Sequence, residues 1–398
     1  MINTKKATRE QTKQHNKQLV LNTIYGQDRI SRVEVARLTS LTRTTVSSVV
    51  SELMDEGLVA EVGVGPSAGG KPPILLSVVD DSYHLIGLDL ANGKFRGAVF
   101  NLRGEIRHRV EIPIDGQGGD EALELVYQLS DQLLKATHSS LLGIGIGAPG
   151  VIDPLQGIIR QAVNLKWENL SLVALLRDRY GLPVYLVNDS HAAALGEYTF
   201  GQHDNATSLI VVKIGRGIGA GIVINGQLFY GNGYGAGEIG HVVVAGNGQQ
   251  CQCGNYGCLE TVAGSRALLK EAITIAQNNP QSQLNQFSNS PEQLSMDQVI
   301  EAFNNGDKSL EPFLANAGRY LAVTIANLIG ALNIEHIVIA GRVANFGPAI
   351  LIPLQTELHK RILSTLVART KIVTSNINAD VVKLGAAALL LTSELGLT

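Results

Sequence analysis

All three cysteines of this 398-residue chain lie in one short segment, Cys251-Gln-Cys253-Gly-Asn-Tyr-Gly-Cys258. A histidine, His241, lies ten residues before the first of them. Three thiolates and one imidazole make a closed tetrahedral shell for a structural zinc ion. The C-x-C-x4-C spacing is too tight for the thiols to pair productively with one another, and the alternative is a group of three ordinary buried thiols. The spacing predicts a structural Zn²⁺ site formed by His241, Cys251, Cys253 and Cys258.

Two acidic residues lie next to these predicted ligands. Glu238 precedes His241 by three positions, and Glu260 follows Cys258 by two. We call residues 251–260 the cysteine knuckle. A metal bound at this knuckle would hold both carboxylates in fixed places.

The composition is that of an ordinary globular protein, with 45% hydrophobic and 17% charged residues. A chain of this length is expected to form two or three domains with well-buried cores. The most apolar stretch, residues 321–340, is interrupted by Asn327, Asn333 and Glu335, so we expect a core helix and a buried strand instead of a membrane span. Residues 1–17 are polar and charged, unlike a signal peptide. With three unpaired cysteines, these features predict a cytoplasmic protein without a membrane partner.

Charge is distributed unevenly along the chain. Residues 1–79 contain ten Lys or Arg and seven Asp or Glu, whereas the whole chain has 32 basic and 35 acidic residues. A basic N-terminal segment on an acidic remainder indicates a polyanionic partner for that segment alone.

The first eighty residues contain the signals of three helices. Apolar residues at positions 19, 20 and 24 predict a short amphipathic helix that ends near Gly26. Ser31 and Glu34 form the capping-box pattern of a second helix. Thr42 is placed to cap a third helix, whose apolar residues at 46, 49, 50, 53 and 54 form one stripe. Gly57 is expected to end that helix.

The opposite face of the third helix carries short hydroxyl side chains and one arginine. Such a face lets the backbone approach a DNA major groove closely, while the helix N-terminus faces phosphate. Two predicted strands, residues 58–62 and 74–78, follow as a hairpin with a glycine-rich wing. This pattern predicts a winged helix-turn-helix, and the alternative is a three-helix protein-interaction module. The predicted DNA-contacting residues are Arg43, Thr44, Thr45, Ser47, Ser48 and the wing residue Lys71.

From residue 83 onward, strands alternate with helices. Strands predicted at residues 85–90, 142–147 and 184–188 end in residues that can carry chemistry, and ligands collect at the carboxyl ends of strands in open α/β sheets. Residues 209–226 repeat the order of strand, glycine turn and strand. The repetition predicts two similar α/β lobes that face a cleft. The glycine turn at 215–221, taken alone, is more typical of a tight hairpin without a ligand.

Together these residues resemble the ROK family, which unites sugar kinases and transcriptional repressors. The resemblance covers essentially the whole chain. It is most specific at residues 235–260, where Glu238-Ile-Gly-His241 and the cysteine knuckle match two family signatures. The winged helix is similar to that of the repressor branch, of the xylose and N-acetylglucosamine type, and the free kinases of the family lack it.

The resemblance implies an α/β fold in which a winged helix-turn-helix precedes a two-lobed, actin-like or ribonuclease H-like sugar-kinase fold with a structural zinc knuckle. We expect the DNA-binding domain at residues 1–80 and the first lobe at residues 81–190. The second lobe, with the zinc site and a dimerisation surface, is expected at residues 191–382. A C-terminal helix, residues 383–396, is expected to complete the first lobe.

The resemblance also implies a sugar pocket. Buried carboxylates and amides suit a sugar because they form directional hydrogen bonds with its hydroxyls. His241 is expected to serve both the metal and the sugar, with one ring nitrogen for each. Asp189, taken alone, is equally typical of a helix N-cap. The residues that match the family's sugar contacts are Gly150, Asn164, Asn188, Asp189, Glu238, His241 and Glu260.

Asp189 also matches the general base of the family's kinases. The loops on the nucleotide side depart from the kinase pattern, because Asp-x-Gly-Gly-Thr-Lys is replaced by Asp-Leu-Ala-Asn-Gly-Lys at residues 89–94. Arg216 interrupts the second phosphate loop, and Ala-Gly-Arg at residues 340–342 replaces a glycine run. Phosphoryl transfer depends on positioning and charge neutralisation around ATP and Mg²⁺. We therefore expect no catalytic residue and a sugar sensor derived from a kinase, although Arg216 carries a charge able to hold phosphate.

These observations predict a DNA-binding repressor of carbohydrate-use genes that acts as a homodimer or homotetramer. Its predicted partners are double-stranded operator DNA and a small sugar inducer. The alternatives are an active ATP-dependent sugar kinase fused to a DNA-binding domain, and a repressor controlled by a protein partner. Pentose, hexose and N-acetylhexosamine pockets share these polar contacts, so all three sugar classes stay open, as does the operator sequence.

Overall fold

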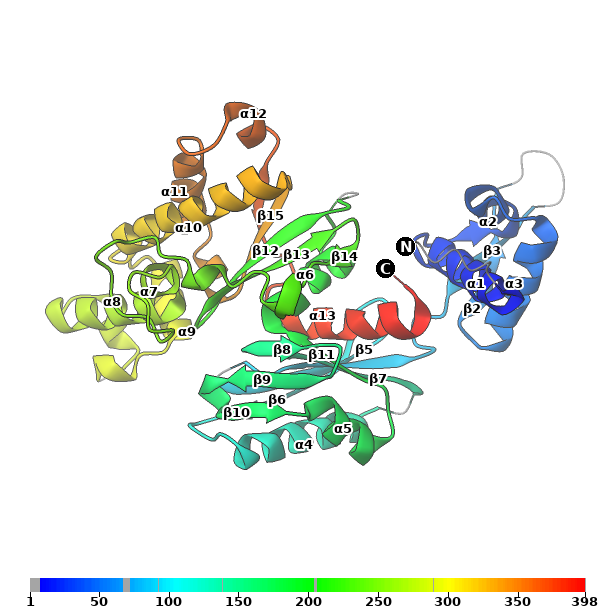
Figure 1. The fold of residues 1–398 in the computed structure, drawn as a ribbon, viewed down its shortest axis with the longest axis horizontal. Coiled ribbons are helices and arrows are strands. Elements are labelled where there is room, and N and C mark those ends of the chain that lie inside the picture. The colour runs from blue at the N-terminus through cyan, green and yellow to red at the C-terminus, as the bar shows by residue number, and fades with distance from the viewer. Residues whose placement is uncertain are drawn as a thin grey trace.

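The structure, a computed structural model, describes residues 8–66, 72–91, 93–137, 139–203, 206–288 and 290–397. A small N-terminal unit, which we call the head, lies at one end of a larger body built on two main sheets (Figure 1). None of the helices in these ranges is long and apolar enough to cross a membrane.

The head is a winged helix-turn-helix. Its helices are α1 (Arg9–Tyr25), α2 (Arg32–Thr39) and α3 (Arg43–Asp55), and its strands β1 (Ile30–Ser31), β2 (Val59–Val64) and β3 (Ile74–Val78) form a sheet in the order β1-β3-β2.

The predicted capping of the head helices is confirmed. The Ser31 hydroxyl accepts from the backbone N–H of Glu34, whose carboxylate accepts in return from the Ser31 N–H at 3.0 Å. The Thr42 hydroxyl accepts from the N–H of Thr45 at 3.2 Å and begins α3. The predicted stripe at 46, 49, 50 and 53 is buried, whereas Met54 is only half-buried. Each helix therefore begins where a side chain satisfies an otherwise unpaired backbone donor.

The short helix predicted before Gly26 was wrong at its start. α1 begins ten residues earlier than its first apolar side chain, because Thr8 and Gln11 form a second capping box. Its first two turns are polar and exposed, so the apolar pattern alone did not mark them.

The first sheet of the body has the strand order β11-β7-β4-β5-β6. Strands β4 (His84–Asp89), β7 (Leu141–Ala148) and β11 (Val184–Asn188) run parallel, and β5 (Lys94–Phe100) and β6 (Ile106–Pro113) add an antiparallel edge. Helices α4 (Asp120–Lys135) and α5 (Leu172–Tyr180) cover one face (Figure 1). The carboxyl ends of β4, β7 and β11 therefore meet at one edge, as the polar residues at their ends predicted.

The second sheet has the strand order β14-β13-β12-β15-β16. Its strands are β12 (Leu209–Ile214), β13 (Ile218–Ile224), β14 (Gln227–Leu228), β15 (His336–Ala340) and β16 (Lys371–Thr374). Its apolar core includes side chains from α8 (Ser265–Asn278), α9 (Met296–Asn304), α10 (Glu311–Leu332) and α11 (Pro348–Leu358). The core helix and buried strand expected in residues 321–340 are confirmed as the end of α10 and β15.

Two helices lie between the main sheets: α6 (Asp189–Phe200) and α13 (Val381–Leu390) (Figure 1). α13 packs on the backbone of β4 and β7. A Cβ atom at Gly145 of β7 would lie only 1.8 Å from the carbonyl oxygen of Ala386, so this approach requires glycine. α13 continues as a π-helical turn, Leu391–Leu395. The helix expected at 383–396 thus exists in two parts, while the domain boundaries at 80, 190 and 382 stay a prediction.

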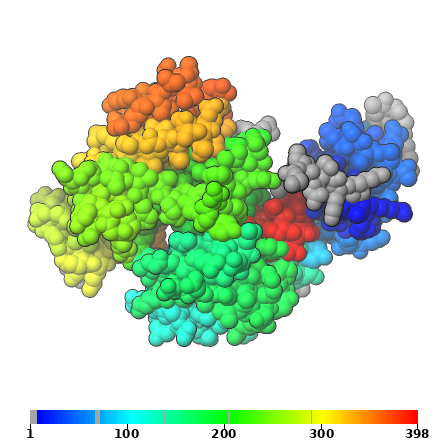
Figure 2. Space-filling model, viewed as in Figure 1, coloured from blue at the N-terminus to red at the C-terminus, as the bar shows by residue number. Residues whose placement is uncertain are grey.

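The C-terminal segment meets the head. Figure 2 shows this segment, in red, where the head joins the body. Leu390, Leu391 and Leu397 belong to the same buried apolar cluster as Val20 and Leu21 of α1. Head and body therefore share one continuous core and are not two separate cores on a loose linker.

Polar contacts complete this joint. The Tyr25 hydroxyl donates to the carbonyl of Leu102 at 2.7 Å, and Arg103 donates to the Tyr25 carbonyl at 2.6 Å. The Arg103 guanidinium also lies 4.5 Å from the centre of the Tyr25 ring. The Asn22 amide donates to the carbonyl of Gly396 at 2.5 Å. Burial raises the pKa of Tyr25 to about 12, so its hydroxyl remains a donor at any working pH.

Substitution of Tyr25 tests this joint. We expect Tyr25→Ala to destabilise the docked head by about 3 kcal/mol, because the ring and its contact with Arg103 are both lost. Tyr25→Phe keeps the ring and is expected to cost only about 1 kcal/mol. Urea denaturation with limited proteolysis measures both. Equal effects of the two variants would show that the ring does not hold the head.

Candidate functional site

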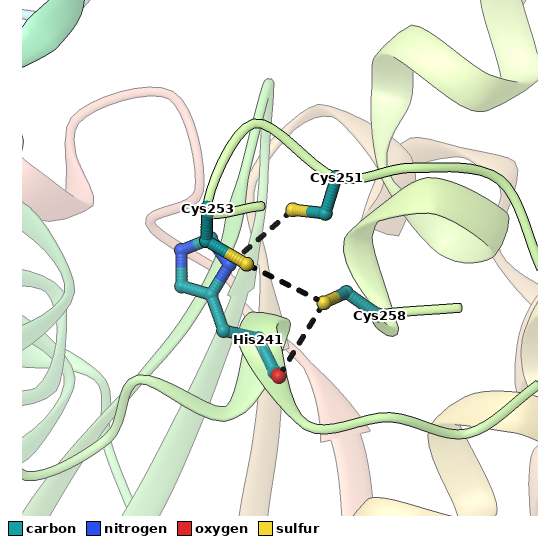
Figure 3. A group of neighbouring side chains, drawn as sticks. All are labelled: His241, Cys251, Cys253 and Cys258. Carbon is teal, nitrogen blue, oxygen red and sulfur yellow. Dashed lines mark hydrogen bonds between the residues drawn. The ribbon is translucent and has the colours of Figure 1, made fainter. Parts of the chain in front are cut away.

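The four predicted metal ligands converge. His241 lies in a 3₁₀ turn, Ile239–His241, and the cysteines lie in the loop before α7 (Glu260–Ala263) (Figure 3). The Cys251 sulfur is 3.5 Å from His241 Nδ1, and the Cys253 and Cys258 sulfurs are 3.7 Å apart. All four ligand atoms lie within 4.8 Å of one another. Zinc–sulfur bonds of about 2.3 Å put the sulfurs of a tetrahedral site about 3.8 Å apart. The cluster can therefore hold a tetrahedral metal ion.

Glycine-dependent turns shape the cysteine knuckle. Gly254 has a φ of +94°, and its N–H donates to the Cys251 carbonyl at 3.0 Å. A Cβ atom at Gly257 would lie 1.7 Å from the Ala245 carbonyl oxygen. The N–H of Asn255 lowers the pKa of Cys253 to about 7, whereas burial raises the pKa of Cys251. The turn thus presents one thiol that ionises readily, which suits a ligand that must be a thiolate.

The two flanking carboxylates face the same imidazole. Glu260 Oε1 accepts from the Cys251 thiol at 3.0 Å and lies 3.9 Å from His241 Nδ1. Glu238 Oε2 lies 4.0 Å from the other ring nitrogen, Nε2. The Nδ1 edge of His241 therefore faces the thiols, and its Nε2 edge faces Glu238. The dual role expected for His241, with one ring nitrogen for the metal and one for the sugar, stays a prediction.

A second group of predicted residues lies at the carboxyl edge of the first sheet. The Asn188 amide donates to the carbonyl of Gly150 at 3.0 Å, and its oxygen accepts from the N–H of Ser190 at 2.8 Å. Gly150 has a φ of +96°, and a Cβ there would lie 2.1 Å from the Gln161 carbonyl oxygen. Asn188 is thus the N-cap of α6. Asp189 is its first residue, so the N-cap alternative for Asp189 was wrong.

α6 joins these two groups. Burial lowers the pKa of His191, so its ring is neutral, and its Nε2 donates to the carbonyl of Ala236 at 2.8 Å. The N–H of Ala220 donates to the Gly237 carbonyl at 2.8 Å. The loop that carries Glu238 is therefore held against the N-terminus of α6, beside Asp189.

Asn164 lies in the turn that follows the segment packed against Gly150. It is exposed in a 3₁₀ turn, Val163–Leu165, between β9 (Ile158–Ala162) and β10 (Trp167–Leu170). β9 lies beside Gly150 through Gln161, but no hydrogen bond joins Asn164 to the cleft residues in the described part of the chain.

The predicted DNA-contacting residues occupy the exposed face of α3. Arg43, Thr44, Ser47 and Ser48 are exposed, while Thr45 is half-buried with its hydroxyl 2.8 Å from that of Thr42. Among the described residues Arg43 forms no ion pair. Lys71 lies outside the described residues, as does Asn92 of the first nucleotide-side loop.

Two residues of the site were missed by the sequence analysis. His191 holds the Glu238 loop, and Lys213 pairs with Asp189, its Nζ 2.7 Å from Oδ2. The signal for Lys213 was present in the sequence, since it is the one charged residue of the apolar strand β12. A lysine in a buried strand needs an acidic or hydrogen-bonding partner close to its ammonium group.

Comparison with known families identifies both parts of the chain. The model described as the ROK family matches residues 85–393, and one described as winged helix-turn-helix DNA-binding matches residues 14–60. A xylose repressor from Caldicellulosiruptor bescii is 34% identical over 96% of this chain and 97% of its own length. The Escherichia coli K12 DNA-binding transcriptional dual regulator NagC is 28% identical over 92% of this chain and 90% of its own length.

Solved structures show the same relation. A ROK family transcriptional regulator, described as a homologue of the E. coli MLC protein, matches with a TM-score of 0.82 and 28% identity over 97% of this chain and 98% of its own. A ROK family glucokinase from Streptomyces griseus, in complex with glucose and AMPPNP, matches with a TM-score of 0.70 and 26% identity over 77% of this chain and 98% of its own.

Removal of one thiol tests the metal cluster. We expect wild-type protein purified without chelator to contain stoichiometric metal and Cys258→Ser to lose it. The variant should melt at least about 5 °C lower, because metal binding contributes directly to folding. Elemental analysis and calorimetry measure the two effects. Treatment of wild-type protein with a chelator should reproduce the shift. A wild-type melting temperature that stays unchanged when a chelator removes the metal would contradict a structural role.

Proposed function

The chain belongs to the ROK family, and from that premise we propose that it is a transcriptional repressor of carbohydrate-utilisation genes whose operator binding is modulated by a free sugar. The observation that carries this proposal is the combination of a winged helix-turn-helix with a sugar-kinase-like fold in one chain. Relatives that match nearly the whole chain are named as xylose and N-acetylglucosamine repressors.

For DNA binding, we propose that the N-terminal half of α3 enters the major groove. Its exposed hydroxyls are short enough for close approach, and Arg43 at its first turn is free to bind a base edge or a phosphate. Thr44, Thr45, Ser47 and Ser48 would line the contact, and Lys71 of the wing would add non-specific affinity.

For sugar binding, we propose the cleft beside α6. Asn188, Asp189 and Gly150 come from the first sheet's edge, whereas Glu238, His241 and Glu260 come from the segment around the metal cluster. Carboxylate and amide groups from two sides suit a ring of hydroxyls. Zn²⁺ is the metal proposed for His241 and the three cysteines, since its preference for tetrahedral sulfur and nitrogen ligands fits the set. Asn164, exposed in the turn after β9, would add a further amide contact to the sugar.

We propose that the sugar signal reaches the head through the helix pair between the sheets. A sugar that draws the lobes together acts at the N-terminus of α6, and α6 packs along α13. The C-terminal end of α13 leads into the core of the head. The connection at residues 79–84 would act as the hinge. In a homodimer or homotetramer, a change in head spacing would remove the match to half-sites about 34 Å or a multiple apart.

The alternative, an active ATP-dependent sugar kinase, draws support from the glucokinase likeness. Against it stand the loops on the nucleotide side, where Ala91 and Arg216 replace the residues of the kinase pattern. Asp189, the matching general base, is already paired with Lys213. A coupled ATPase assay over hexoses and N-acetylhexosamines decides between them, and turnover that Asp189→Ala abolishes would establish the enzyme.

Further proposals concern organisation. Residues 1–80 would form the DNA-binding domain, residues 81–190 with the C-terminal helix the first lobe, and residues 191–382 the second lobe. A protein whose partner is operator DNA would act in the cytoplasm.

Arg43→Ala tests the DNA interface. We expect operator binding to weaken by about 10- to 100-fold, since one good side-chain contact to a base is worth about 1–3 kcal/mol, while sugar affinity is unchanged. Arg319→Ala is the matched control, because Arg319 is exposed on α10 and its loss removes the same charge from the body. Fluorescence anisotropy with the upstream region of the chain's own gene measures both. An equal loss of operator affinity in the two variants would show that only the net charge of the protein matters.

Glu238→Gln tests the sugar site. Glu238 is half-exposed and outside the metal set, so its amide variant should fold and keep metal. We expect the affinity for the inducing sugar to fall by about tenfold or more, because hydrogen bonds to charged groups are worth about 1.5–3 kcal/mol. A thermal-shift screen of pentoses, hexoses and N-acetylhexosamines finds the sugar, and calorimetry compares the variants. Glu301→Gln, exposed on α9, is the control. If no sugar changes operator binding, the sugar-sensor proposal is wrong, and regulation by a protein partner is the alternative that stays.

A further inference from the structure

Lys213 lies where the two main sheets face each other. It is the one charged residue of β12, in the second sheet, and only 17% of its side chain is exposed. Its Nζ is 2.7 Å from Oδ2 of Asp189, which begins α6 at the edge of the first sheet. The ion pair therefore joins the two lobes inside the proposed carbohydrate cleft.

A second carboxylate faces the same ammonium. Asp89, at the end of β4, is 7% exposed, and its Oδ1 accepts from the N–H of Ala91 at 3.1 Å. Its charge interacts with those of both Lys213 and Asp189. The Lys213 ammonium is thus paired with Asp189 and also attracts the charge of Asp89.

Few other charges face this group. Arg96 lies 3.7 Å from Asp89 but is also 3.4 Å from Glu111, and Lys383 of α13 pairs with Asp380 at 2.6 Å. Around Asp189 the remaining titratable neighbours are Glu238, which adds negative charge, and His191, which is neutral. Without Lys213, two largely buried carboxylates would repel each other, with partial compensation from Arg96, which Asp89 shares with Glu111.

We infer that Lys213 is a positioning residue of the carbohydrate site: its ammonium holds the Asp189 carboxylate between the lobes. This inference rests on the proposed sugar-binding function. One oxygen of Asp189 is occupied by the ammonium, and Oδ1, 3.4 Å from the Ser190 hydroxyl, is left to accept from a sugar hydroxyl.

The charge balance gives the inference a pH signature. Burial already raises the pKa of Asp89, and the Lys213 ammonium opposes that rise. In Lys213→Met this opposition is lost, so the pKa of Asp89 rises further above its value in the unfolded chain. The bound proton takes the place of the ammonium at low pH. Its stabilising effect is complete below the unfolded pKa and is lost as pH rises through the raised, folded pKa. The stability of the variant should therefore approach that of wild type at about pH 5.5 and be lower than that of wild type at about pH 8.5.

The experiment compares wild type, Lys213→Met and the double variant Lys213→Met/Asp89→Asn as full-length, metal-loaded proteins. Melting temperatures without sugar and calorimetric sugar affinities are measured from about pH 5.5 to about pH 8.5. We expect the melting-temperature deficit of Lys213→Met to grow with pH and its sugar affinity to fall about tenfold or more at the alkaline end. The double variant has one carboxylate fewer, so both deficits should shrink and lose their pH dependence.

The outcomes separate the two proposals. A deficit that is constant with pH, or a double variant as unstable as the single one, overturns the positioning role while leaving sugar binding by wild type intact. Wild-type protein that binds no sugar overturns the proposed function and, with it, the role of Lys213 at a carbohydrate site. That failure is recognised without any variant.

Discussion

The close packing of α6 against α13 is the contact on which the rest of the body depends. Gly385 of α13 lies so near α6 that a Cβ atom there would be 1.6 Å from the Ala192 carbonyl oxygen. Alanines at 192–194 and 386–388 continue the seam, and all of them are fully buried. Small side chains let two helix backbones approach, and a close-packed interior resists gradual deformation. The two lobes are thus joined through one stiff helix pair.

Both functional ends of the molecule lie on this pair. Asp189 is the first residue of α6, and the residues that follow α13 enter the core of the head. The predicted metal site would have a different role, because Glu238 and Glu260 lie 4.0 and 3.9 Å from the two ring nitrogens of His241, one of its proposed ligands. In the proposed function, the metal site would shape the groups that face the sugar, and the helix pair would connect those groups with the DNA-binding surface. A sugar sensor needs both properties in one chain.

Local signals made much of this predictable. The Ser31–Glu34 and Thr42 caps depend on residues three positions apart, and the knuckle depends on ligands within eighteen residues of His241. Contacts between distant segments were not predictable in the same way. Asn22 and Gly396 are 374 positions apart, and no sequence pattern around either residue indicates that they are in contact. Lys213 is unusual in the sequence because it is a charged residue in an apolar strand. Only the fold shows that it pairs with Asp189 and that its charge acts on Asp89. Sequence therefore predicts sites held by local turns better than sites assembled between lobes.

Energetics limit how the proposed sensor can work. Moving a two-state equilibrium from 1:99 to 99:1 requires differential binding of about 5.5 kcal/mol. A sugar that binds only one state and is present at about 100 times its dissociation constant supplies about 2.7 kcal/mol. One site is therefore too weak to release a tightly held operator, whereas the two sites of a homodimer supply about twice that amount and suffice. This arithmetic favours a symmetric oligomer in which both heads move together. A head that shares the core of the body is useful for the same reason. If the head were loosely tethered, a change in the body would not change the spacing of the recognition helices.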